Sequence, residues 1–177
     1  MKERVRKRTK YLTVSAMLTA LSVVILSLGA LVDVLDITTA ILASFLCIYA
    51  VIELKGAYPW LIWLVTSILA FLLLPIKTPA IFYALFAGFY PILKEKLERL
   101  KPPISIPLKL VTFHVCLAGI CLLLSLFIPD ALDLDGLWWM PILMYVLSLL
   151  CFVVYDLALT RVITFYLVKL KKRFQIK

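Results

Sequence analysis

A run of apolar residues at 13–31 directly follows a basic segment at 2–10, and its side chains sort by size on a helix. At about 100° per residue, small and large side chains fall on opposite halves of that helix. Large apolar side chains suit acyl chains, whereas small ones let another helix approach closely. We therefore expect a docking strip for a partner protein or for another helix of the same chain. The strip consists of Ser15, Ala16, Thr19 and Ala20.

The composition places the chain in the membrane. Of its 177 residues, 64% are hydrophobic, and the mean hydropathy is +1.08. Soluble domains contain roughly 45–50% apolar residues, so we expect an integral membrane protein of a single domain. The net charge of +9 would suggest nucleic acid as a partner of a soluble protein. Here we expect membrane lipid and no nucleic acid, because membrane topology accounts for the cations.

The apolar runs predict an all-α fold with six transmembrane helices. Each crossing needs about 17–25 mostly apolar residues. Charged or proline-containing breaks separate the runs, and the segment with Pro102, Pro103 and Pro107 is expected to end one span before the next begins. Pro79 suits the first turn of the fourth helix. The expected spans are 11–32, 37–54, 57–75, 79–97, 108–128 and 138–160.

The distribution of cations predicts the orientation. Positively charged residues accumulate on the cytoplasmic side of membrane proteins. With both termini in the cytoplasm, the inner segments hold every Lys and Arg of the chain except Lys77. The outer segments hold Lys77 together with Asp33, Asp36, Asp130, Asp133 and Asp135. We therefore predict a multi-pass protein of the cell membrane with both ends inside.

Few residues suit catalysis. None of the common metalloprotease, serine-hydrolase or nucleotide-binding motifs is present in the sequence. His114 and Asp156 fall at similar depths of the fifth and sixth spans, and we expect both to be structural polar residues, with His114 or a tyrosine hydroxyl as the partner of Asp156. The four cysteines lie inside apolar runs without C-x-x-C spacing, which indicates packing thiols. We predict no enzyme activity, no metal site and no cofactor.

The side of the protein expected to lie outside the cell offers a candidate binding site for a small molecule. Lys77 lies in a tight proline-flanked loop, and aromatic residues flank the outer ends of the fourth and sixth spans. Aromatic faces stack on a ring and one cation fixes an anionic group, whereas the alternative is an ordinary belt of interfacial aromatics. The expected ligand is therefore planar or ring-containing and anionic. The candidate residues are Lys77, Tyr83, Trp138, Trp139 and Tyr145.

Three motifs carry a family resemblance. They are Ala16-Met-Leu-Thr-Ala-Leu-Ser22, Gly88-Phe-Tyr-Pro-Ile-Leu-Lys94 and Tyr155-Asp156-Leu-Ala-Leu. Together with the layout of spans, they resemble the substrate-binding S component of an energy-coupling-factor vitamin transporter. The expected first outer loop, near Asp33 and Asp36, is shorter than the lid loop of many members.

The resemblance implies a subunit that binds a vitamin or similar micronutrient from outside and hydrolyses nothing. A transmembrane coupling protein and cytoplasmic ATPases would supply the energy, and Ala16 and Ala20 would face the coupling protein. Two alternatives stay open. One is a six-helix structural scaffold of the cell-envelope machinery, which has partners but no ligand. The other is an intramembrane enzyme, which the lack of a polar constellation disfavours.

Overall fold

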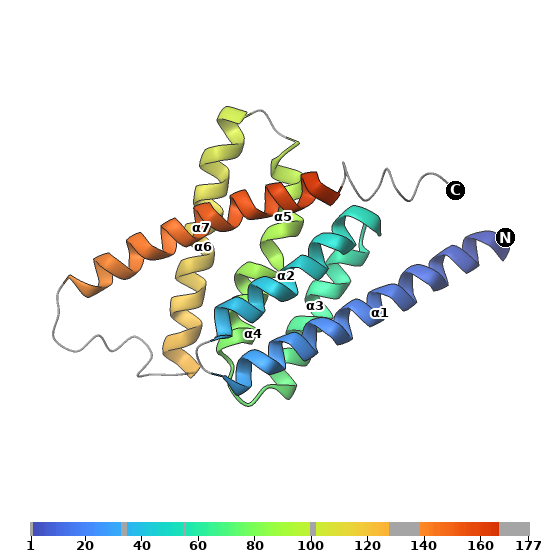
Figure 1. Cartoon of the computed structure of the whole chain (residues 1–177), viewed down its shortest axis with the longest axis horizontal. Coiled ribbons are helices and arrows are strands. Elements are labelled where there is room, and N and C mark those ends of the chain that lie inside the picture. The colour runs from blue at the N-terminus through green and yellow to red at the C-terminus, as the bar shows by residue number, and fades with distance from the viewer. Residues whose placement is uncertain (1, 33–34, 55, 100–101, 128–138, 167–177) are drawn as a thin grey trace. The chain divides into compact units, whose positions relative to one another are not determined.

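The computed structural model describes residues 2–32, 35–54, 56–99, 102–127 and 139–166. Most of these residues are helical, and none of them is in a strand (Figure 1). The chain divides into two compact units, Met1–Ala131 and Leu132–Lys177, and each is considered by itself. Unit 1 holds the elements from α1 to α6, and unit 2 holds α7.

Four helices within the described part are long and apolar enough to cross a membrane. They are α1 (Lys2–Leu31) from Arg8 onward, α2 (Asp36–Glu53), α6 (Pro102–Phe127) from Pro103 onward, and α7 (Met140–Phe165). Helix α3 (Tyr58–Leu73) is apolar but shorter. The all-α membrane class predicted from the composition is thus confirmed, and the count of six spans stays a prediction.

Proline and glycine set several helix boundaries. Pro59 and Pro79 lie in the first turns of α3 and α4 (Thr78–Phe82), as the sequence predicted for Pro79. A first-turn proline costs little because its missing N–H has no partner inside the helix. Between α2 and α3, Gly56 has a φ of 65°. Without a Cβ, glycine adopts this left-handed conformation at low cost, so the chain can turn there.

The fourth helical stretch is not uniform. After α4 the chain forms a π-helix, η2 (Tyr83–Ala87), and continues as α5 (Phe89–Leu97). The Gly88 N–H donates to the Tyr83 carbonyl at 2.8 Å, which is the i to i+5 spacing of a π-helix. The sequence predicted one unbroken span at 79–97, and the wide turn in its middle was not anticipated.

Helix α6 begins earlier than the sequence predicted. We expected the prolines at 102–107 to interrupt the chain, with a helix from 108, but α6 starts at Pro102 and contains Pro107. The first prolines occupy positions whose N–H groups have no helical partner. Pro107 removes one hydrogen bond, a loss that membrane helices tolerate where neighbouring groups satisfy the freed backbone. The break after α5, which ends at Leu97, thus falls before the prolines rather than within them.

Helix α2 is the centre of unit 1, because it packs against α1, α3, α4, η2 and α5. The main core consists largely of small side chains, which lets these helices approach closely. Gly29 of α1 lies so near Thr39 of α2 that a Cβ on Gly29 would overlap the Thr39 side chain. The core residues are Leu26, Ala30, Ala40, Ala43, Ala70, Leu74, Ala80, Tyr83 and Ala87.

Contacts between helices define one end of unit 1 that is rich in cations and aromatic rings, named here the basic end. Tyr11 of α1 meets Tyr58 of α3 edge to face, with ring centroids 5.6 Å apart. The Lys96 ammonium lies 5.1 Å from the Trp60 ring centroid. The N-terminal part of α1, the start of α3 and the end of α5 therefore lie at the same end of the unit.

An ion pair between a buried lysine and an exposed glutamate extends the basic end to α6. The fully buried Lys94 ammonium contacts Glu98 Oε1 at 2.9 Å, and Lys109 of α6 approaches the same oxygen at 3.6 Å. A buried cation is tolerated only when a carboxylate or other acceptors compensate it. The sequence placed Lys94 among the cytoplasmic cations, and nothing in the pattern indicated its burial.

Candidate functional site

The four residues of the predicted docking strip divide between two environments. Ser15 and Thr19 are buried, with 7% and 8% of their surface exposed. Their side chains face the interior of unit 1, where α1 packs against α2 and α3. Ala16 and Ala20 are exposed. The strip is therefore partly internal, and only its alanines remain accessible to a partner.

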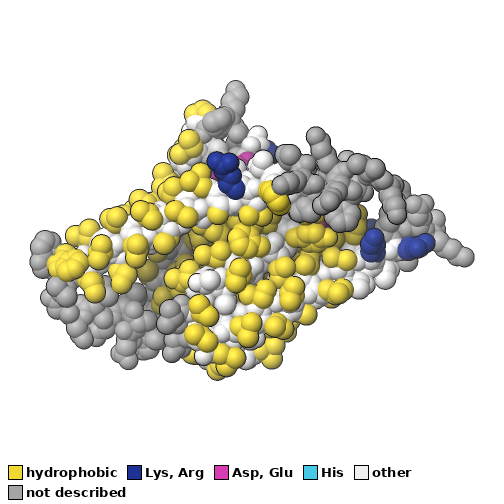
Figure 2. Space-filling model, in the orientation of Figure 1, with side chains coloured by type: hydrophobic (Ala, Val, Ile, Leu, Met, Phe, Trp, Pro, Cys, Tyr) yellow, Lys and Arg dark blue, Asp and Glu magenta, His cyan; other side chains and the backbone are white. Residues whose placement is uncertain are grey.

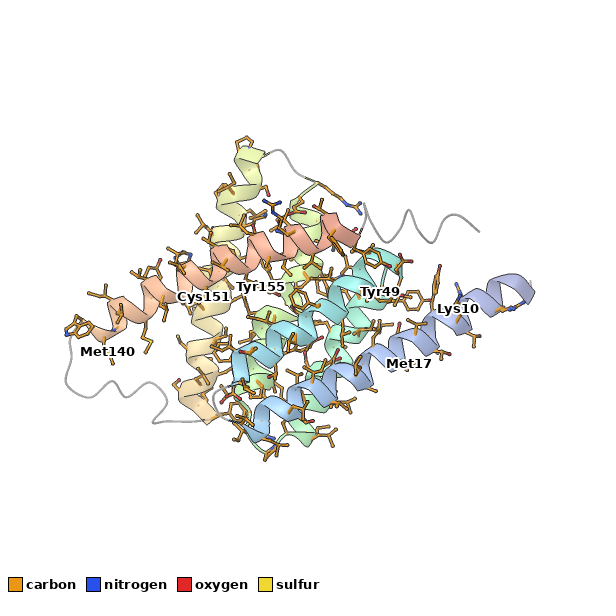
Figure 3. All side chains as sticks on the ribbon, in the orientation of Figure 1. Lys10, Met17, Tyr49, Met140, Cys151 and Tyr155 are labelled. Atoms are coloured by element: carbon orange, nitrogen blue, oxygen red, sulfur yellow. The ribbon has the colours of Figure 1, made fainter. Side chains whose placement is uncertain are left out.

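The alanines belong to a continuous exposed face of α1, named here the outer face of α1. Hydrophobic side chains and cations occupy different parts of α1 in Figure 2, with the cations near its N-terminus. Met17 on this face is 68% exposed and is labelled in Figure 3. The outer face consists of Leu12, Ala16, Met17, Ala20, Leu21, Val24 and Leu28.

Lys77 is engaged with the backbone of its own neighbourhood. Its ammonium donates to the carbonyl oxygens of Phe71 at 2.7 Å and Leu74 at 2.6 Å. These carbonyls belong to the last turn of α3, where backbone acceptors lack helical partners and the helix dipole is negative. The half-buried cation thus caps α3.

Tyr83 lies in the core rather than on a surface. It is fully buried in η2, within the main core cluster. Gly88 makes this packing possible, because a Cβ there would come within 2.8 Å of the Tyr83 ring and 2.7 Å of the Trp63 ring. As it stands, the tyrosine ring fills space between helices.

The remaining candidate residues belong to unit 2. Trp139 and Tyr145 of α7 are 45% and 42% exposed, whereas Trp138 lies outside the described residues. The five predicted binding residues are thus distributed over both units, and their convergence on one ligand stays a prediction.

The polar pair expected in the fifth and sixth spans is also distributed over both units. His114 lies on α6, where its Nδ1 is 2.8 Å from the Leu110 carbonyl oxygen one turn earlier. Asp156 is half-buried on α7. Their mutual contact stays a prediction. Within the described ranges, no group of three or more His, Cys, Asp or Glu side chains converges on a point that could hold a metal ion.

Sequence reasoning missed the contacts around η2. The Trp63 indole N–H donates to the Ala84 carbonyl inside the π-helix at 2.8 Å, and the Cys47 thiol approaches the Gly88 carbonyl at 3.4 Å. Trp63 also meets the rings of Trp60 and Phe89, with centroids 5.7 and 5.8 Å apart. Backbone groups displaced by the π-helix thus gain side-chain partners. The sequence signal was Gly88 beside several aromatic residues.

The thiol contact agrees with the packing role expected of the cysteines. Cys47 and Cys116 are buried, and none of the described cysteines forms a disulfide.

No protein family, curated protein or solved structure matches this chain.

Proposed function

We propose that this protein is a membrane-embedded binding subunit for uptake of a vitamin or similar small micronutrient, docking through its first helix on an energy-coupling module. The observation that carries the proposal is the exposure of Ala16 and Ala20 on a helix that is long and apolar enough to cross a membrane. Small residues exposed to lipid offer a partner helix a close approach without removing large side chains. The resemblance to S components supplies the expected coupling protein and ATPases.

The proposal includes six spans with both termini in the cytoplasm of a prokaryotic cell. Support comes from the basic end of unit 1, where contacts bring together the N-terminal part of α1, the start of α3, the end of α5 and Lys109 of α6. These are the segments that the cation distribution assigns to one side. The opposite end carries Lys77, the lone cation of the expected outer segments.

A second candidate is the structural scaffold without a ligand. Two observations favour it: the Lys77 ammonium already caps α3, and Tyr83 is part of the core. Both residues therefore have a structural role that needs no ligand. The proposal of ligand binding retains Trp138, Trp139 and Tyr145 as candidate residues.

Docking is tested by placing a large side chain on the outer face of α1. Ala16→Trp and Ala20→Trp should abolish co-purification of the coupling protein and ATPases from the native host while leaving the unfolding temperature nearly unchanged. Met17→Trp, at an adjacent position that already carries a large exposed side chain, is the matched control. Retained co-purification in both alanine variants would contradict the docking role.

Ligand binding is tested separately with the purified chain. Thermal unfolding is measured against a panel of vitamins, because a ligand at 100 times its Kd raises stability by about 2.7 kcal/mol. Stabilisation by one compound supports the binding subunit. No stabilisation across the panel, combined with loss of partners in the Ala16→Trp variant, would favour the scaffold.

A further inference from the structure

A shallow groove opens at the basic end of unit 1, between α1 and the start of α3. It has a volume of about 370 Å³ and is lined by Arg8, Thr9, Leu12 and Tyr58. The edge-to-face contact of Tyr58 with Tyr11 joins the two helices beside it. Two neighbouring helices therefore form the groove, which lies where the basic part of α1 gives way to its apolar part.

The lining groups suit an anionic headgroup. The Arg8 guanidinium presents N–H donors in a planar fork that matches phosphate oxygens, and Thr9 and Tyr58 add hydroxyl groups. Arg8 and Thr9 are exposed. Tyr58 is also the first residue of α3, so the positive end of the helix dipole lies at the same place.

The apolar wall indicates an amphipathic ligand. Leu12 is 61% exposed and continues into the outer face of α1, where Met17 is 68% exposed. A soluble anion would gain nothing from this surface, whereas an acyl chain would cover it. The change from Arg8 to Leu12 within one helical turn has the polarity profile of the boundary between headgroups and hydrocarbon.

We propose that this groove binds an anionic phospholipid, with its phosphate against Arg8 and its acyl chains along the outer face of α1. Tyr58 contributes a hydroxyl to the headgroup and an aromatic wall to the glycerol region, as interfacial tyrosines do. The basic end is the end expected in the cytoplasm, where anionic lipids give the membrane surface a negative potential. The inference rests on the groove and on the proposed cytoplasmic orientation of the basic end, and it does not require that the protein binds or transports a vitamin.

The test compares lipid binding by the full chain and by charge variants. The purified protein is titrated with phosphatidylglycerol and, separately, with phosphatidylcholine, and bound lipid is counted by native mass spectrometry. We expect preferential retention of phosphatidylglycerol. Arg8→Gln should weaken that binding about tenfold, since a charge-assisted hydrogen bond to the phosphate contributes at least about that factor.

Neighbouring cations provide the matched controls. Arg6 and Lys10 are exposed on the same helix, but two residues from Arg8 place them about 200° away around the axis. Arg6→Gln and Lys10→Gln remove exposed charges that do not line the groove, and they should therefore leave phosphatidylglycerol binding within about twofold of the unchanged protein. Tyr58→Phe should weaken it while preserving the ring contact with Tyr11, which keeps α1 and α3 together.

Three outcomes would overturn the proposal. One is equal retention of the two lipids, and another is an Arg8→Gln variant that binds phosphatidylglycerol as well as the unchanged protein. The third is an equal loss in all three charge variants, which would show attraction to the basic segment as a whole rather than to the groove. Unfolding temperatures in phosphatidylcholine establish that each variant is folded.

Discussion

Lys77 was predicted to contact a ligand, but in the structure its ammonium caps the C-terminal end of α3. Its ammonium binds the Phe71 and Leu74 carbonyls at the end of α3. Hydrogen bonds to charged groups contribute about 1.5–3 kcal/mol. We expect Lys77→Met to lower the free energy of unfolding by about 1–2 kcal/mol, because the half-exposed site screens part of that contribution.

Lys77→Arg is the control, because it retains a cation that can reach the same carbonyls. Denaturant unfolding in detergent measures both variants. A Met variant as stable as the unchanged protein would show that the cap contributes nothing, and would return Lys77 to the set of residues available for a ligand.

Trp63 carries the second prediction at this scale. Its indole N–H satisfies the Ala84 carbonyl within η2. Trp63→Phe removes that donor and should destabilise the protein by about 1–3 kcal/mol. Trp60→Phe is the matched control, since Trp60 joins the same ring cluster and its ring also lies beneath the Lys96 ammonium. Equal unfolding midpoints in the two variants would contradict a role for the Trp63 hydrogen bond.

Single residues were the hardest level to predict from the sequence. The pattern identified Lys77 as unusual because its charge stood out on the outer side, but a backbone cap leaves no periodic signal. The same holds for Lys94, whose burial depends on Glu98 one turn away. For α1, the size pattern identified the small residues, whereas their division into buried Ser15 and exposed Ala16 depended on where α2 and α3 pack.

At the scale of elements, the contact between α1 and α2 depends on a missing side chain. A methyl group on Gly29 would overlap Thr39. Gly29→Ala gains about 1 kcal/mol of helix propensity, but overpacking typically costs about 1–3 kcal/mol. We therefore expect net destabilisation, measured as a lower unfolding temperature.

Gly119 of α6 offers the control, because a Cβ there would meet the Leu85 side chain at 3.4 Å, an ordinary contact distance. Gly119→Ala should be neutral or stabilising by up to about 1 kcal/mol. If the Gly29→Ala and Gly119→Ala variants had the same unfolding temperature, the result would contradict the close approach of α1 and α2 at Gly29.

Element boundaries were predictable where hydropathy changes and not where backbone chemistry decides. The acidic break between the first two apolar runs falls between α1 and α2, and Pro79 begins a helix as expected. The start of α6 was predicted too late, because proline is compatible with a first turn, as at Pro102, and with a helix interior in an apolar environment, as at Pro107. The π-helix η2 accepts a hydrogen bond at Ala84 from the indole of Trp63, which lies twenty-one residues before Ala84 in the chain.

At the scale of the whole molecule, the composition predicted a membrane protein, and the long continuous apolar runs predicted helices, which satisfy their own backbone hydrogen bonds in lipid. The ligand site was less accessible to such reasoning. It requires the outer ends of separate helices to converge, and nothing in a local pattern specifies that convergence. Trp139 and Tyr145 are exposed on α7, which leaves them available for the binding experiment but does not assign them a ligand.

The orientation of unit 1 gives the last prediction. Pro75, between α3 and α4, is exposed at the end opposite the basic end, and Arg99, after α5, is 74% exposed near Lys109. In a chain whose four cysteines are replaced, Pro75→Cys should react with a membrane-impermeant maleimide in whole cells. Arg99→Cys should react only after permeabilisation, because the segments rich in Lys and Arg stay in the cytoplasm. Labelling of Arg99→Cys in intact cells would reverse the orientation, and with it the assignment of the lipid groove to the inner leaflet.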